Sequence, residues 1–296
     1  MYLLAKHRFG DTSLTYSIRI LAAISLALAC STAAVAQDVP TAEAVTASSH
    51  QGPRPLSQID PNSNFVLRYD VRLGAQTRPA YFGSDEYEVR PDFAIKFDYA
   101  RLRGLGEYGS LSGNSTPSAF GLRGSLRFIG ARNSDDYEDL KGLDDIDASL
   151  ELGLGVVYRE RNFEAFADAR YGTFGHNSFF GEFGMDGIAY PTDNWELRLG
   201  PRVTWGGQGF ADTYFSVDSQ EALASGMDRF KADGGILGAG FEATARYRFN
   251  DLWGIEAGLR GDRMLNDAAN SPITERGTED QFRLRIGITR ELILQF

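Results

Sequence analysis

The stretch FVLRYDVRL, residues 65–73, decides the fold. Its odd-numbered positions hold only apolar or aromatic side chains, whereas Arg68, Asp70 and Arg72 occupy even-numbered positions. A period of two is typical of a β-strand, because successive side chains of a strand point to opposite faces of the sheet. One face of this strand is therefore apolar, and the other carries charges of both signs.

The same alternation recurs along most of the chain. Six further stretches repeat it: residues 93–99, 120–128, 150–159, 195–202, 241–249 and 282–288. Such stretches imply strands of about ten residues or a little more, which is the length that a tilted strand needs to cross a bilayer. A soluble β-sandwich also alternates, but its strands are typically about five or six residues long, and we expect its outer face to be only partly charged.

Charges of both signs on the polar face favour a membrane barrel over a sandwich. Inside a closed lumen, opposite charges pair with one another while the other face of the sheet contacts lipid. The sequence therefore predicts an all-β protein, a transmembrane antiparallel up-and-down β-barrel built from residues 62–296. The net charge of −10 argues against nucleic acid as a partner, since that binding depends on clustered Lys and Arg.

The expected strand connections alternate between short and long, as they do in outer-membrane barrels. Residues 160–162 and 250–251 predict tight periplasmic turns, while residues 130–147, 206–233 and 265–280 predict long outer loops. Counting back from a periplasmic C-terminus, we expect eight strands at residues 119–130, 147–159, 163–174, 178–190, 193–205, 235–249, 252–264 and 280–296.

Before residue 119 the sequence pattern gives an odd number of strands. Runs at residues 64–75, 91–99 and 101–112 predict three more strands, and an even-numbered barrel needs one further strand, which we place between Gln76 and Arg90. The predicted count is therefore twelve, with ten as the alternative. The chain ends on Phe296 after an alternating strand, which resembles the signal that outer-membrane insertion machinery selects.

Residues 1–36 have the features of a cleavable signal peptide. Basic residues precede an apolar run over residues 20–36, and its last three residues, Ala-Val-Ala, form the small-residue pattern that signal peptidase cleaves. We expect cleavage after Ala36, followed by a flexible, proline-containing periplasmic leader over residues 37–61. A lipoprotein anchored through Cys30 is a weaker alternative, because Ala27 stands where the lipidation signal usually has leucine.

Few residues of the exported chain carry catalytic chemistry. Its histidines are His50, in the leader, and His176, which has Ser178 two positions away. A serine beside a histidine suggests a hydrolase, but no third, orienting group can be identified. The alternative is a histidine at a loop end that hydrogen-bonds the turn. We therefore predict that the protein is not an enzyme and assign no catalytic or cofactor-binding residue.

The stretch SDDYEDLKGLDDID, residues 134–147, is the most acidic segment. Its seven carboxylates, from Asp135 to Asp147, are the ligand type that Ca²⁺ prefers. Their spacing matches no calcium-loop pattern. We favour a solvated outer loop near lipopolysaccharide and assign no metal-binding residue, although binding of divalent cations by this loop stays an open alternative.

Several short motifs carry a resemblance to a known family. They are PAYFGSD at residues 79–85, GAR at 130–132, LKGLDDID at 140–147, GHN at 175–177, YFSV at 214–217, SG at 225–226 and LNDAANSPI at 265–273. In this order they resemble the MipA/OmpV family, the MltA-interacting proteins, over nearly all of residues 62–296. Ser216 and the ending Leu294-Gln295-Phe296 depart from the usual family pattern.

The resemblance implies a non-enzymatic outer-membrane β-barrel. It further implies a scaffold that links a peptidoglycan hydrolase, a lytic murein transglycosylase, to a synthase, a penicillin-binding protein. The alternative that the family suggests is a narrow porin-like solute channel or an adhesin. The other expected contacts are outer-membrane lipid and lipopolysaccharide, and no cofactor is expected.

Overall fold

The computed structural model describes residues 60, 62–103, 106–109 and 119–296, which lie in one compact unit. The predicted signal peptide and nearly all of the predicted leader lie outside these residues. Eleven strands are present: β1 (Phe65–Pro79), β2 (Tyr87–Leu102), β3 (Gly106–Gly109), β4 (Ala119–Ile129), β5 (Ser149–Arg159), β6 (Phe163–Gly172), β7 (Phe179–Ala189), β8 (Trp195–Gly206), β9 (Gly235–Arg248), β10 (Trp253–Met264) and β11 (Asp280–Gln295).

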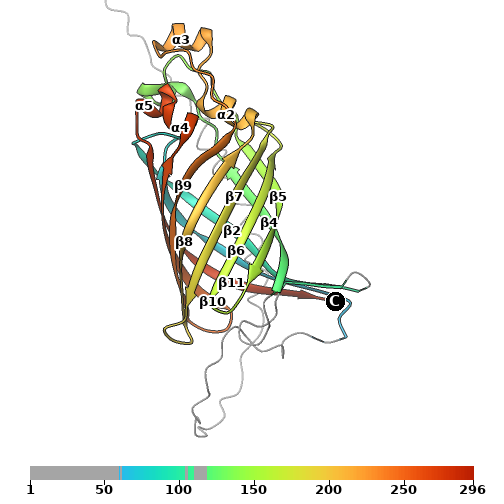
Figure 1. The fold of residues 1–296 in the computed structure, drawn as a ribbon. Helices are drawn as coiled ribbons and strands as arrows, with labels where there is room; N and C mark the ends of the chain where they lie inside the picture. Colours follow the sequence, from blue (N-terminus) through green and yellow to red (C-terminus); the bar gives the residue numbers. More distant parts are fainter. Residues whose placement is uncertain (1–59, 61, 104–105, 110–118) are drawn as a thin grey trace, which may run out of the picture. The chain divides into compact units, whose positions relative to one another are not determined.

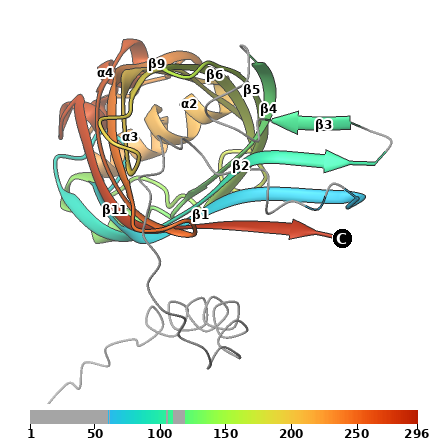
Figure 2. The same ribbon diagram turned by 90° about the horizontal axis from the view of Figure 1, so that it is seen from below.

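All strands belong to one antiparallel sheet, in the order β3-β2-β1-β11-β10-β9-β8-β7-β6-β5-β4. Every strand pairs with its neighbours in the chain, except that β1 also pairs with β11, and that β3 and β4 are not paired with each other. The sheet curls into a barrel, and β4 at one end of the order lies beside β2 and β3 at the other (Figures 1 and 2). The predicted up-and-down barrel is therefore confirmed.

The N-terminal part of the strand prediction is corrected. No separate strand lies between Gln76 and Arg90: β1 runs on to Pro79, a turn over residues 80–86 follows, and β2 begins at Tyr87. The turn is closed by a hydrogen bond from Ala80 N to Glu86 O of 3.0 Å. The runs expected at residues 91–99 and 101–112 form the single strand β2 and the four-residue β3.

The described residues thus hold eleven strands instead of twelve. Ten of them are 10–16 residues long, and these ten match the smaller of the two predicted counts. From β4 to β11, every observed strand boundary lies within two residues of its predicted position.

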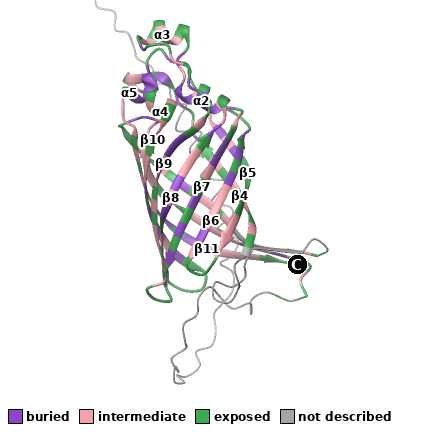
Figure 3. Ribbon diagram, in the orientation of Figure 1, coloured by how far each residue is buried: buried purple, intermediate pink, exposed green. Residues whose placement is uncertain are grey.

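The outer face of the barrel is apolar over much of its height. Leu126, Leu154, Leu199 and Phe241 each expose 60–68% of their surface, although they lie in the middle of strands. Figure 3 shows the resulting alternation of exposed and less exposed residues along the strands. Such a belt of exposed aliphatic and aromatic side chains requires lipid, because water would contact all of it in a soluble protein.

The two ends of the barrel differ. At one end, strands are joined by short turns at residues 160–162, 190–194 and 249–252, and the backbone of Asn64 donates to the carbonyl of Phe296. In outer-membrane barrels this is the periplasmic end. The opposite, outer end carries the long connections and, among the described residues, every helix (Figure 1).

The helices of the outer end are short. They are η3 (Ser134–Asp136), η4 (Glu138–Leu140), α2 (Gln208–Phe215), α3 (Ser219–Ser225), α4 (Asn266–Asn270) and α5 (Pro272–Glu275). None of the described helices is long and apolar enough to span a membrane. We call the segments at residues 80–86, 130–148, 207–234 and 265–279 together the outer cap.

Candidate functional site

The outer cap has its own apolar core. Phe210 and Phe215 of α2 are 1% and 2% exposed, and their rings lie 5.7 and 6.0 Å from the ring of Phe82 in the turn between β1 and β2. Phe180 of β7 packs against Phe210 with 4.9 Å between the ring centroids. Burial of several phenylalanine rings in one cluster stabilises the cap on the barrel wall.

A second apolar cluster ties the remaining cap segments together. Leu140, Val217 and Ile273 come from three different outer connections and are all fully buried. The hydroxyl of Ser271 donates to the carbonyl of Phe215 at 2.7 Å. The four segments of the cap therefore form one packed body, and they contain all the family-like motifs except the one at residues 175–177, which lies between β6 and β7.

The sequence predicted outer loops but not their compact packing. The signal was present in α2, where Phe210, Tyr214 and Phe215 recur at helical spacing. Because the segment is only eight residues long, its periodicity alone did not indicate a buried helix.

Ion pairs cross the lumen of the barrel from wall to wall. Arg246 of β9 reaches Asp70 of β1 at 2.8 Å, and Arg260 of β10 reaches Glu182 of β7 at 3.2 Å. In both pairs the two strands are separated by two others in the sheet. The side chains therefore bridge the lumen as well as line it.

Carboxylates in this network each bind more than one cation. Glu151, which is fully buried, accepts hydrogen bonds from Arg127 at 2.5 Å and Arg170 at 3.1 Å, and its Oε1 lies 3.1 Å from His176 Nε2. Glu256 binds Arg72 at 2.5 Å and Arg246 at 3.0 Å. Such charge-assisted contacts are short and strong, and they hold the long arginine side chains in fixed positions inside the barrel.

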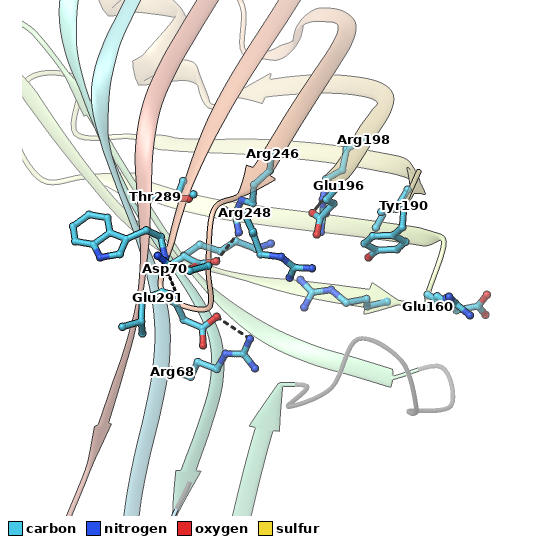
Figure 4. A pocket seen from close by; sticks show the side chains of 18 residues that line it. Arg68, Asp70, Glu160, Tyr190, Glu196, Arg198, Arg246, Arg248, Thr289 and Glu291 are labelled. Carbon is cyan, nitrogen blue, oxygen red and sulfur yellow. Dashed lines mark hydrogen bonds and ion pairs between the residues drawn. The ribbon is translucent and has the colours of Figure 1, made fainter. Parts of the chain in front are cut away.

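The periplasmic end of the lumen contains an open cavity of about 110 Å³. Seven cationic side chains line it, namely Arg68, Lys96, Arg159, Arg161, Arg198, Arg246 and Arg248, together with four carboxylates, Asp70, Glu160, Glu196 and Glu291. Figure 4 shows Arg246 and Arg248 between the Asp70 side of the cavity and Glu196. The cavity thus collects positive charge in a chain whose net charge is −10.

Two arginines at this mouth have no carboxylate partner among the described residues. Arg248 donates to the backbone carbonyl of Asp193 at 2.7 Å, and Arg161 lies exposed in the turn between β5 and β6. This cavity was not predicted from the sequence. Its signal was the basic residues at the periplasmic ends of the strands, which become neighbours only when the sheet curls.

His176 and Ser178 do not form a nucleophile and base pair. The Nδ1 atom of His176 accepts the backbone N–H of Ser178 at 3.2 Å, and its Nε2 faces Glu151. With both ring nitrogens engaged, the imidazole has no free position from which to take a proton from the Ser178 hydroxyl. The arrangement instead fixes the turn that leads into β7.

The acidic loop uses several of its carboxylates within the cap. Asp145 accepts from the backbone N–H and the hydroxyl of Ser134 at 2.8 and 3.1 Å, and Glu138 pairs with Lys141 at 2.5 Å. Within residues 119–296 and the other described residues, no group of three or more His, Cys, Asp or Glu side chains is arranged to hold a metal ion.

Together, these features define a β-barrel of the outer-membrane type, with a cap over its outer end and ion pairs across its lumen. The chain belongs to the family described as MltA-interacting protein MipA, whose family model matches residues 71–292. A search of curated proteins finds no match.

Three of the solved structures that match this chain are the following. An outer membrane channel from Pseudomonas putida F1 shares 12% identity at a TM-score of 0.42, covering 84% of this chain and 100% of that one. A porin shares 8% identity at a TM-score of 0.28, covering 77% and 100%. Neisserial surface protein A shares 9% identity at a TM-score of 0.23, covering 77% and 97%.

Proposed function

We propose that the protein is a non-conducting, non-enzymatic scaffold of the outer membrane that binds a lytic murein transglycosylase at its periplasmic end and links it to a penicillin-binding murein synthase. The description of the family names an interaction with MltA. The observation that carries the choice of a scaffold over a solute channel is the closure of the barrel: ion pairs bridge the lumen, and the cap covers the outer end.

The periplasmic mouth is the proposed contact with the transglycosylase. Its cationic cavity favours an acidic surface on the partner, as do Arg161 and Arg248, which have no carboxylate partner in the described part of the chain, because complementary charge speeds association and orients the complex. In this proposal residues 1–36 are a signal peptide cleaved after Ala36, and the leader over residues 37–61 adds to the contact. The exposed apolar belt faces membrane lipid, and the cap faces lipopolysaccharide.

Capture of the purified transglycosylase by the barrel in detergent tests the contact. We expect the double variant Arg161→Glu, Arg248→Glu to weaken binding roughly thirtyfold at low salt, since each reversed rim charge alters the binding free energy by on the order of 1 kcal/mol and the two changes together by about 2 kcal/mol. The matched control is Arg229→Glu, because Arg229 is an exposed arginine of the outer cap. Deletion of residues 37–61 is expected to lower recovery further. Equal capture by parent and double variant would refute the contact at this mouth.

Recording from planar bilayers tests the closed lumen. We expect the purified barrel to give no stable conductance steps, whereas a porin-like channel would give them. Steps of constant size in the parent protein, absent from a control preparation without the barrel, would replace the scaffold with the channel as the function.

A further inference from the structure

Two arginines of the outer half of the lumen lack the partners that their neighbours have. Arg78 of β1 and Arg283 of β11 make no hydrogen bond or ion pair with any described residue, and the Nε atom of each is buried. Both lie at lumen-facing positions, since Arg72 on β1 and Arg285 on β11 have the same parity and belong to the ion-pair network. A charged group without a partner in a closed interior is costly and calls for an explanation.

The strand register places these two cations beside further positive charge. Arg283 is directly opposite Arg260 of β10, and Arg78 is one position beyond Thr77↔Leu284, the last pair of the β1 and β11 ladder. Three adjacent strands therefore present arginines in one row. Like charges directly opposite each other destabilise a sheet unless a counter-charge lies between them.

Two more arginines complete the cluster. The charges of Arg90 and Arg127 act on Arg78, and the charges of Arg127 and Arg260 act on Arg283. A methyl group placed on Gly130 would lie 3.6 Å from Arg78 Nη2 and 3.9 Å from Arg90 Nη1, so these two guanidinium groups are close to each other. We call Arg78, Arg90, Arg127 and Arg283 the arginine cluster.

The carboxylates nearby are already engaged. Glu88 pairs with Arg90 and accepts the Tyr137 hydroxyl at 2.8 Å. Glu151 is held by Arg127 and Arg170, and Glu182 lies 3.2 Å from Arg260. Asp262, whose charge also acts on Arg283, binds Arg260 at 2.6 Å. Two positive charges, those of Arg78 and Arg283, are therefore left over.

We propose that the arginine cluster binds the phosphate group of a ligand inside the outer half of the barrel. A phosphate group carries a charge of about −1.5 to −2 near neutral pH, which matches the two surplus positive charges. The planar guanidinium group offers two parallel N–H donors that fit two oxygens of one phosphate group. A chloride ion is a single acceptor atom and matches this pair of donors poorly. Inorganic phosphate and the phosphate of a membrane amphiphile share this chemistry.

The position of the cluster gives both sources a path. Arg90 lies on β2 and Gly130 directly follows β4, so the cluster lies near the place where these two strands come together at the ends of the sheet. Among the described residues, β2 and β4 have no ladder hydrogen bonds with each other. A phosphorylated amphiphile can approach from the bilayer there, whereas a free ion enters from water.

Thermal unfolding and calorimetry on the full barrel test the proposal. The first arm adds sodium phosphate to the protein in an uncharged detergent, against sodium chloride of equal ionic strength. The second arm uses nanodiscs of phosphatidylcholine with and without phosphatidic acid. We expect phosphate to raise the unfolding temperature in at least one arm, and the arm that responds identifies the source.

The variants Arg78→Gln and Arg283→Gln separate binding from folding. Each is expected to weaken phosphate binding roughly tenfold, because each removes charge-assisted hydrogen bonds. Without phosphate, both are expected to unfold at the same temperature as the parent or higher, since an unpaired charge has been removed. The control Arg161→Gln, at the periplasmic mouth, is expected to bind phosphate as the parent does. No response of the parent in either arm, or an unchanged response of both Arg78→Gln and Arg283→Gln, would overturn the proposal.

Discussion

Glu151 is the position where one substitution tests the role of the lumen network most directly. Its carboxylate is fully buried on β5 and contacts Arg127, Arg170 and His176. The change Glu151→Gln keeps the size of the side chain but removes its charge. The buried guanidinium group of Arg170 and the half-buried one of Arg127 then lose their principal counter-charge.

The expected cost follows from these contacts. Breaking a buried ion pair by removing one partner costs about 3–5 kcal/mol, because the remaining charge is buried without compensation. Glu182, 4.0 Å from Arg170, offers partial compensation to that residue. The glutamine oxygen also accepts one hydrogen bond. We therefore expect the free energy of unfolding to fall by about 3 kcal/mol, at the lower end of this range.

Urea unfolding of the barrel in detergent micelles, followed by tryptophan emission and by the heat-dependent gel shift of folded barrels, measures this loss. The control is Arg263→Gln, because Arg263 and its partner Asp280 are 59% and 51% exposed, and such pairs contribute at most about 1 kcal/mol. A loss below about 1 kcal/mol for Glu151→Gln would refute the view that the network holds the lumen in one arrangement.

Three further changes probe the outer cap. Phe210→Ala removes a ring that is 1% exposed, so we expect a loss of about 3–5 kcal/mol in cap stability and faster proteolysis of the outer connections. Gly142→Ala is expected to destabilise the cap by at least about 1–2 kcal/mol, because Gly142 has φ +88° and a Cβ there would lie 2.5 Å from the backbone of Ala224. The control is Gly226→Ala, because Gly226 has φ +71° with open space around it, so that this variant has the backbone strain without the clash. Burial and the hydrogen bond to Glu88 raise the pKa of Tyr137 to about 12. The neutral phenol therefore stabilises the cap below pH 10, and this contribution is lost as the pH rises from 10 to 12. In Tyr137→Phe, the absorbance of tyrosinate is expected to show one fewer tyrosine that ionises near pH 12.

The wall of the barrel could be predicted from the sequence because its pattern is local. A residue and its second neighbour in a strand share a face, so the apolar and charged positions of β4 to β11 are visible in the sequence without knowledge of the pairing. The periplasmic turns between them, at residues 160–162, 190–194 and 249–252, contain too few residues to hide another element. This explains why these eight strands were found with nearly correct ends.

The first part of the chain was harder for a physical reason. The segment at residues 76–90 contains the end of β1, a turn and the start of β2, and Gly83 with φ +92° lets the chain reverse there in few residues. Alternation continues on both sides of that turn. Period alone therefore could not separate one hairpin from an additional strand.

The cap and the periplasmic cavity could not be predicted, because both depend on contacts between distant segments. Phe82 and Phe210 are 128 positions apart, and Arg68 and Arg248 are 180 apart, yet each pair shares one cluster or cavity. Sequence period gives the face of each strand but not which segments meet at its ends. The ion pairs across the lumen were expected as a class, whereas the bridging of Glu182 and Arg260 required the curvature of the sheet.

The place of the family-like motifs bears on how the scaffold proposal is to be understood. Tyr81, Leu143, Tyr214 and Ile273 belong to motifs that carry the resemblance, and all four are buried in the two clusters of the cap. Side chains that are buried in the cap cannot also contact a murein enzyme in the periplasm. The motifs therefore describe how the cap is packed, and the proposed contact with the partner lies at the opposite end, where the cationic cavity is. In the proposed scaffold the two ends of the barrel have separate tasks: the cap and the ion pairs of the lumen close the barrel, and the cationic periplasmic mouth binds the partner.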